Sequence, residues 1–316
     1  MLRTWLTDRF GLQIPLVAAP MGGAASASFA AAVTRSGALG MVAAGSKATA
    51  ESLREELNAA AAIGLPYGVG LLGWVVAHRP EIIEVVIEAK PVLVSISYGG
   101  LTDHIDALRG AGIPIASQVG TLDDARQAAA QGVDIVVARG GEGGGHGRDE
   151  MATLPLIQEV LDAIEVPVLA AGGIATARGL AAVLAAGAVG AWVGTAFLGC
   201  VETAWSEAAR QSVLRAGDGD TIYTTAFDIG LGIDWPSEFG GRALRNKFSD
   251  QWHGNETALP GDQEASEAMA RAVTAQDMSV APVWAGQSVS LVNEKRTVAD
   301  VIAGFAEAEN LLRRWA

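Results

Sequence analysis

The stretch VDIVVARGGEGGGHGR, residues 133–148, joins a short apolar run to a glycine-rich loop that carries one histidine. The apolar run at 133–138 is typical of a buried strand. Six glycines surround His146 in the loop, and glycine permits backbone conformations that a Cβ would resist. Such a loop lets main chain approach a flat ligand closely while presenting one titratable imidazole. The alternative is a surface loop with an incidental histidine. The neighbouring segments are needed to distinguish a ligand-binding loop from a surface loop.

Seven further apolar runs resemble this strand, and helical patterns separate them. We predict strands at 14–20, 37–45, 67–73, 91–100, 113–120, 133–140, 166–174 and 187–198. We predict helices up to residue 35 and at 49–63, 81–89, 103–109, 122–131, 154–164 and 177–186. Nearly continuous apolar strands joined by crossover helices are typical of a parallel sheet that is buried on both faces. Eight such units predict an α/β fold of the TIM-barrel, or (β/α)8, class.

A doubly wound open sheet is the rival architecture. It places its phosphate-binding glycines after the first strand. Here the glycine-rich loops follow the sixth, seventh and eighth predicted strands. Their position therefore favours the barrel.

The character of the chain changes after the eighth strand. We divide it into a barrel core at 1–215, a cap or lid at 216–296 over the barrel mouth, and a C-terminal helix within 297–316 that packs back on the barrel. Residues 216–262 are rich in glycine, aspartate and aromatic residues, and helical patterns follow at 262–275 and 298–315. A lid is favoured because the last barrel loops lie on the ligand-binding face. An outer helical layer with no part in catalysis is the alternative.

Composition limits the classes of partner and site. The formal net charge is −13, which argues against nucleic acid or an anionic membrane surface as partner. Cys200 is the single cysteine, which excludes an intrachain disulfide and offers no cysteine cluster for a metal ion. Its apolar neighbours, TAFLGCVE, predict a core residue. We expect no metal site.

Neither a secretory signal nor a membrane span is expected. The first eleven residues carry three charges and no long apolar core. The run at 179–201 is uncharged, but five glycines and an expected change from helix to strand interrupt it. We therefore expect a cytoplasmic protein.

Two glycine loops predict a phosphate site. In barrels the loops after strands seven and eight commonly bind phosphate, and here they contain Gly172 and Gly173, then Gly194 and Thr195. Their backbone N–H groups can point at an anion, and the helix that starts at Thr176 adds a favourable dipole. Tight packing at strand-to-helix turns is the alternative. Two such loops at neighbouring strands favour a phosphorylated cofactor or substrate.

The loop after the first strand would lie at the same barrel mouth. It contains Pro20, Met21 and Gly22. Its backbone could lie against one side of an aromatic ring system. The alternative is a tight turn in which Met21 fills the core.

Three ordered motifs resemble one known family. They are PLVAAPMGGAASASFAAAVTRSGALGMVAAG at 15–45, GGEGGGHGR at 140–148 and VPVLAAGGIATARGLAAVLAAGAVGAWVGTAFL at 166–198. Together they resemble the nitronate monooxygenase family, formerly called 2-nitropropane dioxygenases. The resemblance extends over residues 10–202, with a weaker similarity in GGRALRNKF at 240–248.

The resemblance implies FMN that is bound without a covalent link. The residues expected to border its isoalloxazine ring are Pro20, Met21 and Gly22, and those expected to hold its phosphate are Gly172, Gly173, Gly194 and Thr195. His146 would be the catalytic residue over the reactive face of the flavin, as a base or as a group that stabilises an anionic nitronate. Gln118, at the end of the fifth strand, is expected to make a polar contact to the flavin.

The reaction implied by the resemblance is the oxidation of alkyl nitronates and nitroalkanes by O2 to a carbonyl compound and nitrite. Its partners would be this small-molecule substrate and O2, with no nucleic acid and no membrane; a homodimer is left open. Two positions depart from the family pattern. Arg139 stands where many members have glutamine, and Gly70 stands where many carry a polar amide. Both departures leave the substrate preference open.

Two other functional classes stay open. The barrel and the glycine–histidine loop also resemble flavin-dependent enoyl-acyl carrier protein reductases and NADH:quinone reductases. An FMN-dependent NAD(P)H oxidoreductase is therefore the alternative, although a carrier-protein enzyme needs a basic docking patch and this chain is acidic. A non-enzymatic flavin- or phosphate-binding protein is the third class. It is disfavoured by a histidine in the middle of the expected barrel mouth.

Overall fold

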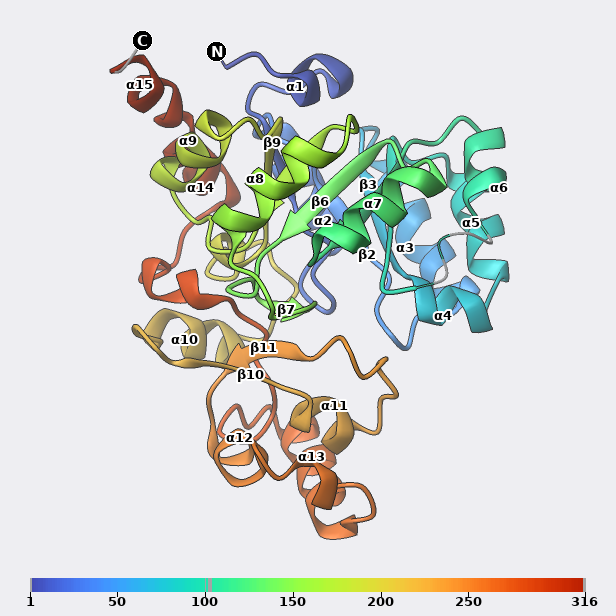
Figure 1. The fold of residues 1–316 in the computed structure, drawn as a ribbon. Helices are drawn as coiled ribbons and strands as arrows, with labels where there is room; N and C mark the ends of the chain where they lie inside the picture. Colours follow the sequence, from blue (N-terminus) through green and yellow to red (C-terminus); the bar gives the residue numbers. More distant parts are fainter. Residues whose placement is uncertain (1, 100, 102–103, 315–316) are drawn as a thin grey trace.

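The computed structural model describes residues 2–99, 101 and 104–314 and shows a parallel barrel with a smaller unit, drawn from β10 (Thr221–Thr224) to α13 (Gln263–Ala275), beyond one end (Figure 1). The eight barrel strands are β1 (Leu16–Ala18), β2 (Met41–Ala43), β3 (Gly68–Leu72), β4 (Leu93–Ser97), β5 (Ile115–Val119), β6 (Ile135–Arg139), β8 (Val168–Ala171) and β9 (Gly190–Val193). Their order around the sheet is β1-β9-β8-β6-β5-β4-β3-β2, and each named pair is parallel.

Backbone bonds between the first two βα units close the sheet into a barrel. The Leu39 N–H donates to the Leu16 carbonyl over 3.0 Å, and the Ala18 N–H donates to the Leu39 carbonyl over 2.9 Å. These bonds flank the bridge between Val17 and Leu39. The predicted (β/α)8 barrel is confirmed.

Helices follow the strands as the sequence predicts. They are α2 (Ala27–Arg35), α3 (Ala50–Ala62), α5 (Glu81–Ala89), α6 (Ile105–Gly110), α7 (Leu122–Gln131), α8 (Thr153–Ala163) and α9 (Ala177–Ala185). Side-chain caps fix several starts: the Thr121 hydroxyl, for example, accepts from the Asp124 N–H at the start of α7. Gly132 ends α7 with φ 89°, which glycine adopts without strain. The predicted start of α6 at residue 103 lies outside the described residues.

Two short helices, α1 (Trp5–Phe10) and α4 (Gly73–His78), were not predicted. Leu72 precedes α4 without a side-chain cap, so the sequence carries no start signal there. The Leu6 side chain of helix α1 packs into the apolar cluster that fills the barrel interior. That cluster also contains Val17, Leu39, Leu93 and Ile135, all fully buried. A larger cluster packs the helices against the outside of the strands.

All eight barrel strands are shorter than predicted, and two of them end where the chain changes direction. The predicted strand at 187–198 is only β9, followed by the 3₁₀ helix η1 (Thr195–Phe197), because Gly194 turns the chain with φ −112° and ψ −71°. The predicted strand at 91–100 ends at Ser97, because Tyr98 takes the left-handed region at φ 69°. Both changes of direction occur where strands reach the barrel mouth.

We call residues 216–296 the cap segment. It contains β10 (Thr221–Thr224), α11 (Ala226–Leu231), β11 (Gly241–Leu244), α12 (Lys247–Trp252), η2 (Glu256–Ala258), α13 (Gln263–Ala275) and η3 (Gln287–Leu291), and it follows α10 (Glu207–Arg215). The helix predicted at 262–275 is α13. Strands β10 and β11 form an antiparallel sheet with β7 (Gly145–His146) of the glycine–histidine loop. Figure 1 shows β7 and β11 side by side beyond the carboxyl end of β6.

The predicted C-terminal helix at 298–315 is wrong in one respect, because it consists of two helices. They are α14 (Val298–Ala306) and α15 (Ala308–Arg313), with a turn at Glu307 that redirects the chain. The turn lets α15 pack against α9, while α14 packs against α2 and α9. Residues 315 and 316 lie outside the described part of the chain. None of the helices described is long and apolar enough to cross a membrane.

Candidate functional site

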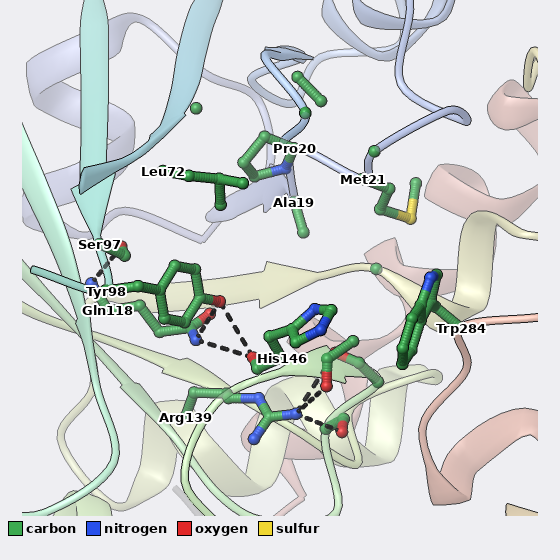
Figure 2. Close-up of a pocket in the computed structure, with 18 of the residues that line it drawn as sticks. Ala19, Pro20, Met21, Leu72, Ser97, Tyr98, Gln118, Arg139, His146 and Trp284 are labelled. Atoms are coloured by element: carbon green, nitrogen blue, oxygen red, sulfur yellow. Dashed lines mark hydrogen bonds between the residues drawn. The ribbon is translucent and has the colours of Figure 1, made fainter. Parts of the chain in front are cut away.

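A cavity of about 450 Å³ lies at the carboxyl ends of the barrel strands. Every residue predicted for the site lines it: Pro20, Met21, Gly22, Gln118, His146, Gly172, Gly173, Gly194 and Thr195. Figure 2 shows Pro20 and Met21 on one side of the cavity and Tyr98, His146 and Trp284 on the other. The structure therefore brings together nine residues from strand β5 and from the loops after β1, β6, β8 and β9, as expected at the mouth of a closed barrel.

Three residues of the cap segment contact the His146 side chain. The His146 Nε2 lies 2.9 Å from both carboxylate oxygens of Asp228, and the two side chains are 11% and 4% exposed. The imidazole stacks on Trp235 with centroids 3.6 Å apart and planes 4° apart. Trp284 lies on it at a tilt, 4.6 Å away. The backbone of His146 pairs with Gly241 of β11.

Asp228, Trp235 and Trp284 were not singled out from the sequence, although all three line the cavity. The segment 226–236, AFDIGLGIDWP, carries two aspartates and one tryptophan within the predicted lid, and no motif distinguishes them. Asp228 lies 82 residues beyond His146 along the chain. The pairing depends on how the cap segment folds over the barrel.

Arg139, at the end of β6, folds the glycine–histidine loop back onto its strand. The guanidinium donates to the carbonyl oxygens of Gly143, Gly144, Gly145 and Arg148 (Figure 2 draws part of this network). The side chain is buried, and burial lowers the pKa of the guanidinium from its ordinary value. No carboxylate within the described chain lies within 4 Å of it. Its charge is therefore stabilised by carbonyl dipoles.

The loop needs glycine where it passes this guanidinium. A Cβ on Gly147 would lie 2.5 Å from an Arg139 nitrogen, and Gly147 has φ 151°. A Cβ on Gly143 would lie 2.8 Å from the Arg139 side chain. The arginine that departs from the family pattern therefore organises the loop that carries His146.

A second network supports the same loop from β4 and β5. The Gln118 amide nitrogen donates to the Tyr98 hydroxyl over 2.7 Å, and that hydroxyl donates to the His146 carbonyl over 3.0 Å. Burial raises the pKa of the Tyr98 phenol, which keeps it a donor at neutral pH. Tyr98 holds left-handed backbone, which is uncommon for a bulky residue and often marks a functional site. Gln118, predicted as a contact to flavin, thus also positions the His146 backbone.

The loops after β8 and β9 have the features of an anion cradle. Gly172 and Gly173 take φ 100° and 68°, and the backbone N–H groups of Gly172, Gly173 and Gly194 have no acceptor among the described residues. The Thr153 hydroxyl donates to the carbonyl of Ala171 or Gly172, at 2.9 and 3.1 Å, which holds these carbonyls on the side away from the cavity. Unpaired N–H groups beside a cavity favour an anionic ligand.

Helix α9 begins just after this turn, and the dipole at its N-terminus favours an anion nearby. Its N-cap residue, Thr176, makes no side-chain capping bond, so first-turn N–H groups stay free. The Thr195 hydroxyl accepts from the Gly286 N–H over 2.9 Å and can still donate to a ligand. These groups fit the phosphate of a bound ligand.

Gly70, the other departure from the family pattern, makes room for Pro20. A Cβ at this position would lie 2.2 Å from the Pro20 Cγ. An amide side chain at residue 70 is therefore incompatible with this position of Pro20. The absence of a side chain at Gly70 lets the Pro20 ring form part of the cavity wall.

The remaining titratable candidates lie elsewhere. Cys200 is buried, as predicted for a core residue, and burial raises the pKa of its thiol to about 12, which keeps it protonated. His78, His104 and His253 do not line the cavity. Within the described residues, no group of three or more histidine, cysteine, aspartate or glutamate residues could hold a metal ion.

Comparisons with known proteins identify the relatives of this chain. The family model for nitronate monooxygenase matches residues 3–73 and 73–307. A nitronate monooxygenase of Neurospora crassa is 30% identical over 337 residues, which cover 92% of this chain and 88% of that protein.

Two solved structures resemble the whole fold. FabK from Thermotoga maritima is 30% identical with a TM-score of 0.86, and the match covers 100% of both chains. A nitroalkane oxidase from Streptomyces ansochromogenes is 28% identical with a TM-score of 0.82, covering 97% of this chain and 99% of that one. Since the family model matches most of the sequence, the chain belongs to the nitronate monooxygenase family.

Proposed function

We propose that this chain binds FMN and uses O2 to oxidise alkyl nitronates and nitroalkanes to a carbonyl compound and nitrite. Membership of a flavin-dependent family already makes it an oxidoreductase that acts on small molecules. The observation that carries the finer proposal is the placement of His146. Its imidazole faces a cavity that has an anion cradle at one end and the wall of Pro20 and Met21 opposite.

FMN, with its single phosphate, suits this cavity. Gly172, Gly173, Gly194 and Thr195 would hold the phosphate, for which free N–H groups and the start of α9 are available. Pro20, Met21 and Gly22 would border the ring, and Gln118 would contact its polar edge. Bound flavin would supply the electron transfer that protein side chains lack.

His146 would act on the substrate in two ways. For a neutral nitroalkane it would remove the α-proton, because a neutral imidazole has one ring nitrogen whose lone pair can accept a proton. For a preformed nitronate it would serve as a polar contact to the anion. Trp235 and Trp284 beside it give the pocket apolar walls that exclude water around the reacting carbon.

Anaerobic mixing tests this proposal. Purified protein loaded with FMN is mixed with propyl-2-nitronate and, separately, with NADH or NADPH, while the flavin absorbance is followed. We expect nitronate to bleach the flavin rapidly and the pyridine nucleotides to leave it oxidised. Rapid bleaching by NADH or NADPH with none by nitronate would contradict the proposal and favour an NAD(P)H oxidoreductase.

A further inference from the structure

We propose that Asp228 is a positioning residue that holds His146 as the Nε2–H tautomer, so that Nδ1 is the nitrogen that accepts the substrate proton. This inference rests on the proposed function, because it assigns the basic nitrogen for that reaction. It assigns to the cap segment a direct part in the chemistry of the barrel.

The hydrogen bond between the two side chains determines which nitrogen of the His146 ring carries the hydrogen. An ionised carboxylate only accepts hydrogen bonds, so the partner nitrogen must donate. Both Asp228 oxygens lie 2.9 Å from the His146 Nε2, and within the described residues the carboxylate has no other hydrogen-bond partner. In the neutral ring, Nε2 therefore carries the hydrogen and Nδ1 keeps its lone pair.

That lone pair is open to the cavity. The His146 Nδ1 has no hydrogen-bond partner in the described part of the chain. In the same part of the chain, two side-chain atoms are both fully buried and without a hydrogen-bond partner, Trp74 Nε1 and His104 Nε2. The His146 Nδ1 also lacks a partner there but is not one of these two, so it is not fully buried. Since His146 lines the cavity, Nδ1 is accessible from there.

The indole of Trp235 fixes the plane of the imidazole. The two rings are stacked 3.6 Å apart, and Trp284 lies against the imidazole at a tilt of 48°. A ring held between aromatic side chains and a buried carboxylate has little freedom to rotate. Asp228 and Trp235 both belong to the cap segment, so the cap sets the orientation of the base.

In this assignment, Nδ1 receives the proton that the nitroalkane loses. The α-carbon–hydrogen bond of the nitroalkane breaks, and its electron pair becomes the carbon–nitrogen double bond of the nitronate. The proton moves to Nδ1, and the resulting imidazolium faces the Asp228 carboxylate across the Nε2 bond. A carboxylate in this position stabilises the imidazolium without taking its proton. A preformed nitronate needs no such step.

The kinetic test compares Asp228→Asn with Asp234→Asn. Both changes remove one carboxylate from the same segment, but Asp234 is exposed and does not line the cavity. We expect Asp228→Asn to lower nitroethane turnover by about 10²- to 10⁴-fold at unchanged FMN content, with a much smaller loss on ethylnitronate. Asp234→Asn should match the unchanged protein on both substrates. Equal losses on the two substrates, or none, would overturn the assignment.

A spectroscopic test needs neither turnover nor the Asp228→Asn variant. The chain has four histidines, so imidazole ¹⁵N resonances can be resolved after histidine-selective labelling, and His146→Asn identifies the signal by its loss. At alkaline pH, the unchanged protein should show His146 with hydrogen on Nε2. Hydrogen on Nδ1 would overturn the proposal. Because this readout needs no substrate, it separates a failure of the tautomer assignment from a failure of the proposed reaction.

Discussion

The Arg139 guanidinium donates a 3.0 Å hydrogen bond to the carbonyl of Gly145, the residue that precedes His146. Bonds to Gly143, Gly144 and Arg148 come from the same side chain. One buried cation at the end of β6 therefore holds the loop that presents the candidate catalytic histidine. The Tyr98 hydroxyl secures the His146 carbonyl from the neighbouring side.

Arg139→Met should destabilise the protein, because it leaves several buried carbonyl groups without donors. We expect a loss of about 3 kcal/mol in the free energy of unfolding, measured by denaturant titration at fixed FMN concentration. Amide hydrogen exchange in residues 140–147 should rise as well. Arg126→Met is the control, because Arg126 is exposed and its contact to Asp123 at 3.7 Å contributes little. Equal effects of the two changes would contradict this role for Arg139.

Gly173→Asp should abolish retention of FMN. The new side chain starts 3.1 Å from Glu142 and adds a carboxylate beside the cradle for the phosphate. Flavin absorbance of the purified variant, with circular dichroism to check the barrel, measures the effect. Gly64→Asp is a matched control, because Gly64 has a similar φ of 73° and open space around it, away from the cavity. Full flavin content in Gly173→Asp would remove the basis for this phosphate site.

His146→Asn should separate the two substrate classes. Nitroethane needs removal of a proton and should be turned over about 10²- to 10⁴-fold more slowly, whereas ethylnitronate is already deprotonated and should lose much less. Steady-state nitrite release at equal FMN content measures both. His253→Asn, an exposed position on the cap segment, should leave both rates unchanged. Equal losses on both substrates would show that His146 is not the base.

The sequence predicts the barrel and most of the cavity, because both follow from local patterns. Eight apolar runs mark the strands, and closure of a parallel barrel brings the carboxyl ends of all strands to one mouth. The glycine loops and His146, which are far apart in the chain, therefore meet there. Each predicted residue lies at the end of, or just after, a strand whose position the apolar pattern already indicates.

The partners of His146 could not be predicted in this way. Asp228 lies on the short helix α11 and Trp235 in the loop that follows it, in a stretch whose sequence shows no clear helical or strand periodicity, and their approach depends on the pairing of β7 with β11. Nor does a local pattern show that Arg139 turns toward loop carbonyls or that Gly70 makes room for Pro20. These contacts are long-range or depend on side-chain direction, which a single sequence does not specify.

Aerobic turnover of propyl-2-nitronate tests the central claim most directly. Oxygen consumption and nitrite release are measured on the same sample of purified, FMN-loaded protein without added pyridine nucleotide. We predict that oxygen is consumed and that nitrite appears together with the ketone. Rapid NADH-dependent reduction of a quinone or an enoyl thioester, with no nitrite from any nitronate, would contradict the account.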